Sequence, residues 1–242
     1  MEVEAPGKAR ANGLKTVLDV IIAPREAFEQ LRAAPTWGWA LLILLVLYAL
    51  ASWLITPGVV HATQSDWPRT VASNPSLAQM TPDQQQHALT FTLRIVSLIW
   101  LFSPVVAMIA VVVLAIVMLI FKALGRGSAS FATIWAAAVN IQVPILAING
   151  LVTAAIVMLR GADTFNSSAD IQTAMPSLAL LVDPASLKLH AFASAFNPFT
   201  LWGIGLVVGA MTISARVSRG WAWATAIVWI LAAACFIALA AR

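Results

Sequence analysis

Four residues in one apolar stretch are the best candidates for a binding or mechanical role. Asn140, Gln142, Pro144 and Asn149 all lie within the apolar length of residues 131–159. Pro144 lacks a backbone N–H and frees a carbonyl near Asn140, and amide side chains can bind a polar headgroup or a neighbouring helix. Two interpretations stand: a polar groove or hinge, or hydrogen bonds between helices, typically worth about 0.6 kcal/mol in a membrane.

The residue types needed for catalysis are missing from the apolar runs. No Asp, Glu, Lys, Arg or His lies well inside them, which argues against an ion-coupled carrier but not against a carrier of neutral or lipidic molecules. The three histidines have no metal-ligand spacing, the single cysteine lies in the last apolar run, and no nucleophile elbow or phosphate loop occurs. We expect no enzymatic activity, no metal and no cofactor.

Gly205 and Gly209 form a GxxxG pattern in a fourth apolar run. Small residues at this spacing let two membrane helices approach closely. The partner would be another span of the same chain or a second copy, and internal packing is the favoured interpretation.

Composition predicts an all-α, polytopic membrane protein. Hydrophobic residues make up 61% of the chain and charged residues only 10%, and the apolar runs approach or exceed the ~20 residues that cross a bilayer as a helix. A helix satisfies its own backbone in lipid. We predict a cytoplasmic segment, residues 1–36, and a membrane domain, residues 37–242, whose five spans cover about 37–56, 95–121, 131–159, 199–215 and 221–240.

The segment before the first span contains an amphipathic helix. Leu14, Val17, Leu18, Ile21 and Ile22 share one helical face. Two placements stand: flat on the membrane surface, or packed on the protein's own spans.

We expect two features to separate the first span from the second. Pro57-Gly58 should end the first helix, and residues 61–80 should form a loop because they are polar with scattered Pro and Asn. Residues Thr81-Pro82-Asp83 then begin the next helix, with a kink expected at Pro104.

Lysine and arginine positions predict the orientation. Nine of the 14 lie in the N-terminal segment, including Lys8 and Arg10, or in two short turns. The other five, ending with Arg242, lie on the opposite side. The positive-inside rule therefore predicts a cytoplasmic N-terminus and an external C-terminus. We expect the chain to lie in the inner cell membrane. The same rule explains the basic balance without a nucleic-acid partner.

Two helical hairpins follow similar patterns. An offset of 94 residues aligns residues 102–135 with residues 196–229, matching Phe, Pro, a basic residue and Trp. Either a parallel duplication or the repeated use of a well-packing hairpin accounts for the pattern.

Short motifs in a fixed order resemble those of the Yip domain family, the Ypt/Rab-interacting membrane proteins, in its prokaryotic branch. The matching positions are Pro24, Phe28, Pro35, Trp37, Gly125, Gly127, Ser128, Phe131, Pro144, Phe196, Asn197, Pro198, Phe199 and Trp202. The resemblance implies a five-span helical fold with a cytoplasmic N-terminus. Eukaryotic members act with Rab-type GTPases, but their longer N-terminal regions are absent here, so GTPase binding is not carried over.

These observations lead to two functional hypotheses. The first is a non-enzymatic membrane protein that organises lipids or protein partners, with the bilayer, another membrane protein or a second copy as its partners. The alternative is a transporter or lipid-translocating protein for a neutral or lipidic substrate, with residues 140–149 lining the path. A water-filled crevice reaching Asn140 would favour the alternative, and dry, interlocked spans would favour the first.

Overall fold

The computed structural model describes residues 12–183 and 186–240. Every regular element within these residues is a helix. Four helical segments are long and apolar enough to cross a membrane, and a fifth is added if one bent pair counts as a single span. The prediction of an all-α, polytopic membrane protein is confirmed, with four to five spans.

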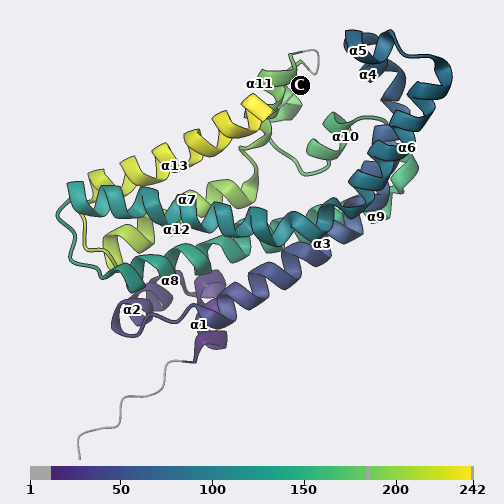
Figure 1. Cartoon of the computed structure of the whole chain (residues 1–242). Helices are drawn as coiled ribbons and strands as arrows, with labels where there is room; N and C mark the ends of the chain where they lie inside the picture. The colour runs from purple at the N-terminus through teal and green to yellow at the C-terminus, as the bar shows by residue number, and fades with distance from the viewer. Residues whose placement is uncertain (1–11, 184–185, 241–242) are drawn as a thin grey trace, which may run out of the picture.

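The spanning segments lie side by side along most of their length (Figure 1). The first is α3 (Gly38–Ser65). The second joins α6 (Pro82–Leu98), η1 (Ile99–Phe102) and α7 (Ser103–Leu124). The third joins α8 (Phe131–Gln142), η2 (Val143–Ile148) and α9 (Asn149–Arg160). The last are α12 (Pro198–Ile213), bent by 54° from α11 (Leu187–Ser194), and α13 (Arg219–Ala240).

Short helices gather at the two ends of this bundle. Those at the end with the α7–α8 and α12–α13 turns are α1 (Gly13–Ile22) and α2 (Pro24–Ala33). Those near the other end are α4 (Trp67–Ser73), α5 (Pro75–Ala78), η3 (Ala162–Thr164), α10 (Ser168–Gln172) and η4 (Leu178–Leu181).

The helix of the first span does not end at Pro57-Gly58, contrary to our expectation. Helix α3 continues to Ser65, since a proline removes only one hydrogen bond and contacts with the third span hold the next turns. A Cβ added at Gly58 would lie 3.0 Å from Val157 Cγ1, and His61 Nδ1 lies 3.0 Å from the carbonyl oxygen of Phe165. The predicted loop over residues 61–80 is also largely helical.

Helix α1 packs on the protein along one face and leaves another face exposed. Val17 and Val20 are buried in the core of the bundle. Leu14, Leu18 and Ile22 form an exposed stripe at helical spacing. One face therefore packs on the protein while another is available to lipid.

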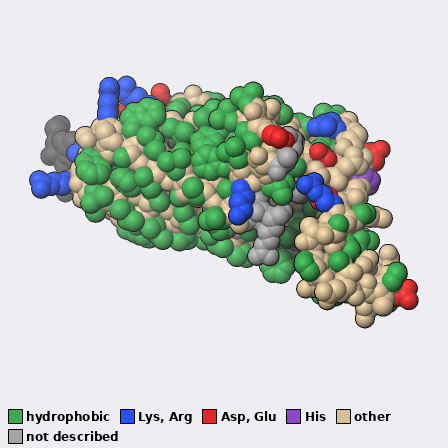
Figure 2. Space-filling model, turned by 90° about the horizontal axis from the view of Figure 1, so that it is seen from above, with side chains coloured by type: hydrophobic (Ala, Val, Ile, Leu, Met, Phe, Trp, Pro, Cys, Tyr) green, Lys and Arg blue, Asp and Glu red, His purple; other side chains and the backbone are tan. Residues whose placement is uncertain are grey.

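Apolar side chains cover the middle of the molecular surface. Figure 2 shows a broad apolar region, with mostly lysine and arginine side chains and a few acidic ones at one end and a mixture of acidic and basic side chains toward the other. This distribution is that of a membrane-embedded bundle with polar ends. Helix α13 ends at the end of the bundle opposite α2 (Figure 1), as five crossings would require if the bent pair α11–α12 counts as one span.

The orientation and the repeat stay predictions. Lys8, Arg10 and Arg242 lie outside the described residues. Both hairpin turns hold an arginine in the left-handed region, Arg126 with φ 53° and Arg216 with φ 56°. These two arginines are 90 residues apart, so the offset of 94 does not align the turns residue for residue.

Candidate functional site

Two basic turns are docked directly on each other at one end of the bundle. The backbone N–H of Ser128, after α7, donates to the carbonyl of Ala215, after α12, over 3.0 Å. A Cβ at Gly127 would lie only 2.5 Å from that carbonyl oxygen, and one at Gly125 would lie 3.1 Å from the ring of Trp221. Glycine is therefore required at Gly127 by the close approach of two backbones.

Helix α2 is fixed beside these turns by its contacts with α12. Phe28 is fully buried, and the hydroxyl of Ser214 donates to the Phe28 carbonyl over 2.8 Å. A Cβ at Gly209 would lie 3.3 Å from the Phe28 ring. The motif residue Phe28 thus anchors α2, and the exposed face of the helix lies next to the α12–α13 turn.

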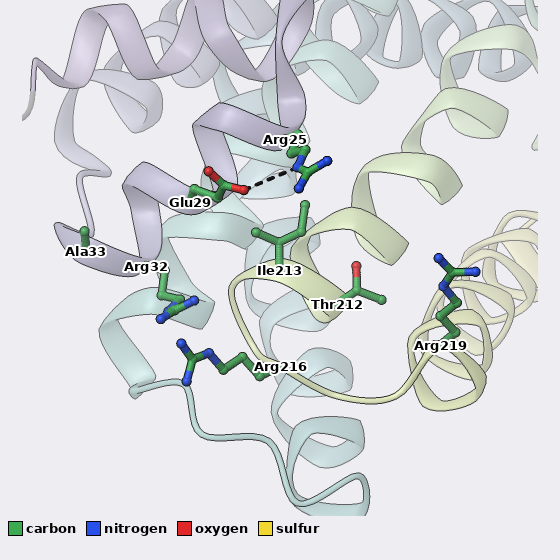
Figure 3. Close-up of a pocket in the computed structure, with 8 residues that line it drawn as sticks. All are labelled: Arg25, Glu29, Arg32, Ala33, Thr212, Ile213, Arg216 and Arg219. Atoms are coloured by element: carbon green, nitrogen blue, oxygen red, sulfur yellow. Dashed lines mark hydrogen bonds and ion pairs between the residues drawn. The ribbon is translucent and has the colours of Figure 1, made fainter.

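This docking creates an open hollow of about 890 Å³ lined mainly by arginine (Figure 3). Its lining residues are Arg25, Glu29, Arg32, Ala33, Thr212, Ile213, Arg216 and Arg219. We call it the arginine hollow. It was not predicted, because its arginines lie in segments about 190 residues apart in the sequence, where each of them indicates only orientation.

The charges of the arginine hollow are unbalanced. Arg25 Nε pairs with Glu29 Oε1 over 3.3 Å, both side chains being exposed. Among residues 12–183 and 186–240, Arg32, Arg216 and Arg219 make no ion pair. Arg32 and Arg216 extend toward each other in Figure 3, so two like charges face one another across the hollow.

The polar residues of the third span do not gather into one site. Asn140 Nδ2 donates to the carbonyl of Thr36, just before α3, over 3.0 Å, and to that of Ala136 over 2.8 Å. Gln142 Nε2 donates in a different direction, to the carbonyl of Ala110 in α7 over 3.2 Å. Each side chain therefore ties the third span to a different neighbour.

Three side-chain oxygens of the polar residues in the third span accept no hydrogen bond from the described residues. Asn140 Oδ1, Gln142 Oε1 and Asn149 Oδ1 are buried and have no hydrogen-bond partner within the described residues. Pro144 lies at the start of η2, a π-helical turn, and the N–H of Val143 takes the Asn140 carbonyl that the proline leaves free. A π-turn of this kind is often found at functional positions.

The two glycines of the GxxxG pattern have different surroundings. Gly209 faces Phe28, whereas a Cβ at Gly205 would meet nothing within 4 Å. The tightest glycine of α12 is Gly203, where a Cβ would lie 2.5 Å from Ile145 Cδ1. Internal packing thus uses Gly203 and Gly209, and Gly205 is on open surface.

Two motif prolines begin helices, and a third lines a second hollow. Pro24 and Pro198 occupy the first turns of α2 and α12. Pro35 lines an open hollow of about 520 Å³ together with Asn12, Gly13, Thr36, Trp37, Gly38 and Trp39.

The aromatic motif residues pack at or near helix starts. Phe131 is exposed and stacks on Trp135 with ring centroids 6.3 Å apart. Phe196 contacts Phe192 at 5.5 Å. Phe199 and Trp202 lie in the first turns of α12: the Phe199 N–H is capped by Asn197 Oδ1, and Trp202 packs on the core.

Comparison with known proteins assigns the chain to a family. The family model of the Yip1 domain matches residues 18–241, nearly the whole chain. The match does not separate the prokaryotic branch from the rest. No curated protein and no solved structure matches the chain. Among the described residues, no group of three or more His, Cys, Asp or Glu could hold a metal ion.

Proposed function

The chain belongs to the Yip1 domain family, and from this premise we propose that it is a non-enzymatic integral membrane protein that organises lipids or protein partners in the membrane. It is a multi-pass membrane protein by its apolar helices. Our proposal places it in the inner cell membrane with a cytoplasmic N-terminus.

One observation carries the organising role: the amides of the third span fasten it to two other segments, the residues just before α3 and helix α7. Asn140 and Gln142 are 1% and 2% exposed, and their donors bond the carbonyls of two other segments. Neither the arginine hollow nor the hollow at Pro35 is lined by Asn140, Gln142 or Asn149. Polar residues that fasten helices and line neither of these hollows support a scaffold better than a conduit.

The second candidate is a protein that translocates a lipid or another neutral molecule. Its support is the three unpaired acceptors beside the π-turn. An unpaired buried acceptor costs about 1–3 kcal/mol, and a passing hydroxyl or amide group would satisfy it. In this case Pro144, at the π-turn, would act as the hinge.

Reconstitution in liposomes separates the two candidates. The full chain is incorporated into vesicles with a fluorescent phospholipid in both leaflets, and a membrane-impermeant reductant bleaches the outer leaflet. The organising role predicts bleaching of about half the signal, as in protein-free vesicles. Translocation would be established, and the scaffold refuted, by two results together. More than half of the fluorescence would be bleached, and Pro144→Ala or Asn140→Ala would slow this additional bleaching.

The identity of the protein partner requires a separate experiment. Cross-linking of the chain in its native membrane, followed by identification of the linked chains, is expected to recover a second copy or another membrane protein. If only monomers are recovered over a range of cross-linker lengths, lipid remains as the organised component.

A further inference from the structure

We infer that the arginine hollow is a binding site for a phosphate-bearing anion at the membrane surface. The inference deepens the organising role proposed above, because a phospholipid headgroup is one source of such an anion and free phosphate is the other.

The charge of the hollow favours an anion. Four arginines and one glutamate line it, and the glutamate is already paired with Arg25. Arg32 and Arg216 face each other (Figure 3), a repulsive arrangement that an anion between them would convert to attraction. Guanidinium groups bind phosphate oxygens through paired N–H donors, so a phosphate fits this hollow better than a small monovalent anion.

The geometry of the hollow is held by buried contacts below it. Arg216 has a left-handed backbone, which is uncommon for a residue with a Cβ. The turn is fixed on one side by the Ser128–Ala215 hydrogen bond and on the other by the bond from Ser214 to Phe28. The arginines therefore start from a prearranged backbone, and less ordering entropy is lost on binding.

The hollow lies at the depth of lipid headgroups. Trp221 is exposed, follows Arg219 closely, and contacts Phe121 in the last turn of α7 at 6.0 Å. Trp37, also exposed, contacts Trp135 near the start of α8 at 6.5 Å. Tryptophans mark the interface between hydrocarbon and water, and basic pockets between spans at this level bind anionic headgroups. A lipid headgroup is thus the favoured source.

Arg216 and Arg126 form a matched pair for the test. Both follow a span at the same end of the bundle, and both have left-handed backbones, with φ 56° and 53°. Only Arg216 lines the hollow. Substitution by glutamine removes one charge in each case and leaves the backbone demand the same, so any difference reports the hollow itself.

The experiment measures the dissociation constants of three probes for the full chain in uncharged detergent. The probes are dioctanoyl phosphatidylglycerol, dioctanoyl phosphatidylcholine and inorganic phosphate. Phosphatidylglycerol should bind more tightly than phosphatidylcholine. Arg216→Gln should weaken its binding about tenfold, the loss expected for one charge-assisted contact, whereas Arg126→Gln should change it less than twofold. Arg32→Gln, on the exposed face of α2, repeats the test if Arg216→Gln fails to fold.

The outcomes separate the sources and the refutation. Binding of phosphatidylglycerol that millimolar phosphate does not displace identifies the lipid headgroup. Phosphate binding of its own, weakened by Arg216→Gln, identifies the free anion. Two results would overturn the site and leave only a diffuse surface charge. One is an equal change of the dissociation constant in Arg126→Gln and Arg216→Gln. The other is an unchanged dissociation constant in both Arg216→Gln and Arg32→Gln. These results do not depend on lipid bleaching, so this inference and the organising role can fail separately.

Discussion

The docked basic turns and the π-turn of the third span differ in how completely their polar groups are hydrogen-bonded. At the turns, the groups that cross between segments are matched, as in the bonds from Ser128 to Ala215 and from Ser214 to Phe28. In the third span, Asn140 and Gln142 have paired donors but unpaired oxygens. The turns are therefore held in one geometry by paired groups, whereas the third span contacts its neighbours with part of its hydrogen-bonding capacity unused.

The largest effect is expected where backbones meet at the turns. Gly127→Ala would place a Cβ 2.5 Å from the Ala215 carbonyl oxygen and 2.8 Å from Val217 Cγ1, and overpacking of this kind costs about 1–3 kcal/mol. The free energy of unfolding in mild detergent should fall by about the upper end of that range. Gly220→Ala is the control, because nothing lies within 4 Å of its added Cβ. Equal stability of the two variants would mean that the turns are not docked.

The next effect contrasts the two amides of the third span. Asn140→Ala removes two donated hydrogen bonds and leaves the Thr36 carbonyl without that donor, at a cost of about 1–2 kcal/mol. Gln142→Leu removes one long hydrogen bond together with an unpaired oxygen, so stability should change by less than about 0.5 kcal/mol. The same unfolding titration measures both, and a larger loss for Gln142→Leu would reverse the comparison.

A smaller effect is expected at the joint between α2 and α12. Ser214→Ala removes the buried hydrogen bond to the Phe28 carbonyl, worth about 1 kcal/mol, and should loosen α2 more than the rest of the chain. Trypsin reports this directly, since Arg25 and Arg32 are exposed on α2. Cleavage there should accelerate several-fold, while Thr212→Ser, whose hydroxyl can still bond the α12 backbone as in the parent chain, should leave the rate unchanged.

The smallest effects separate the two glycines of the GxxxG pattern. Gly205→Ala adds a methyl group to open surface of α12 and should stabilise the helix by up to about 1 kcal/mol through its higher helix propensity. Gly209→Ala would press on the Phe28 ring at 3.3 Å and should lose that gain. If Gly205→Ala instead reduces cross-linking between copies of the chain, Gly205 is a contact between copies.

Hydropathy and helix-boundary chemistry made much of the fold predictable from sequence. The spans are long apolar runs, and the helix start predicted at Thr81 is capped in the structure, where the Gln84 N–H donates to the Thr81 hydroxyl. The helix across Pro57 was not predictable, because contacts with Val157 and Phe165 far along the chain hold it. Polar residues 61–80 resembled a loop for the same reason: local composition does not report tertiary support.

The candidate site was predictable only in part. Asn140, Gln142 and Pro144 stood out because polar groups and proline are unusual in an apolar run, and the structure places them at the π-turn. The arginine hollow could not be seen, because Arg32 and Arg216 meet only after Phe28 has docked on α12. The different surroundings of Gly205 and Gly209 likewise depend on where α2 lies, and the GxxxG spacing does not predict the position of α2.

Water access to the third span tests the central claim, that its amides fasten this span to its neighbours and line no path. Cys235 is the only cysteine of the chain, so Cys235→Ser provides a background for single thiols. Ala147→Cys, fully buried in η2, and Ala33→Cys, exposed at the arginine hollow, are treated with a water-soluble maleimide in liposomes. We predict rapid labelling at position 33 and labelling at position 147 only after denaturation. Labelling of position 147 in the folded chain at a comparable rate would contradict the account.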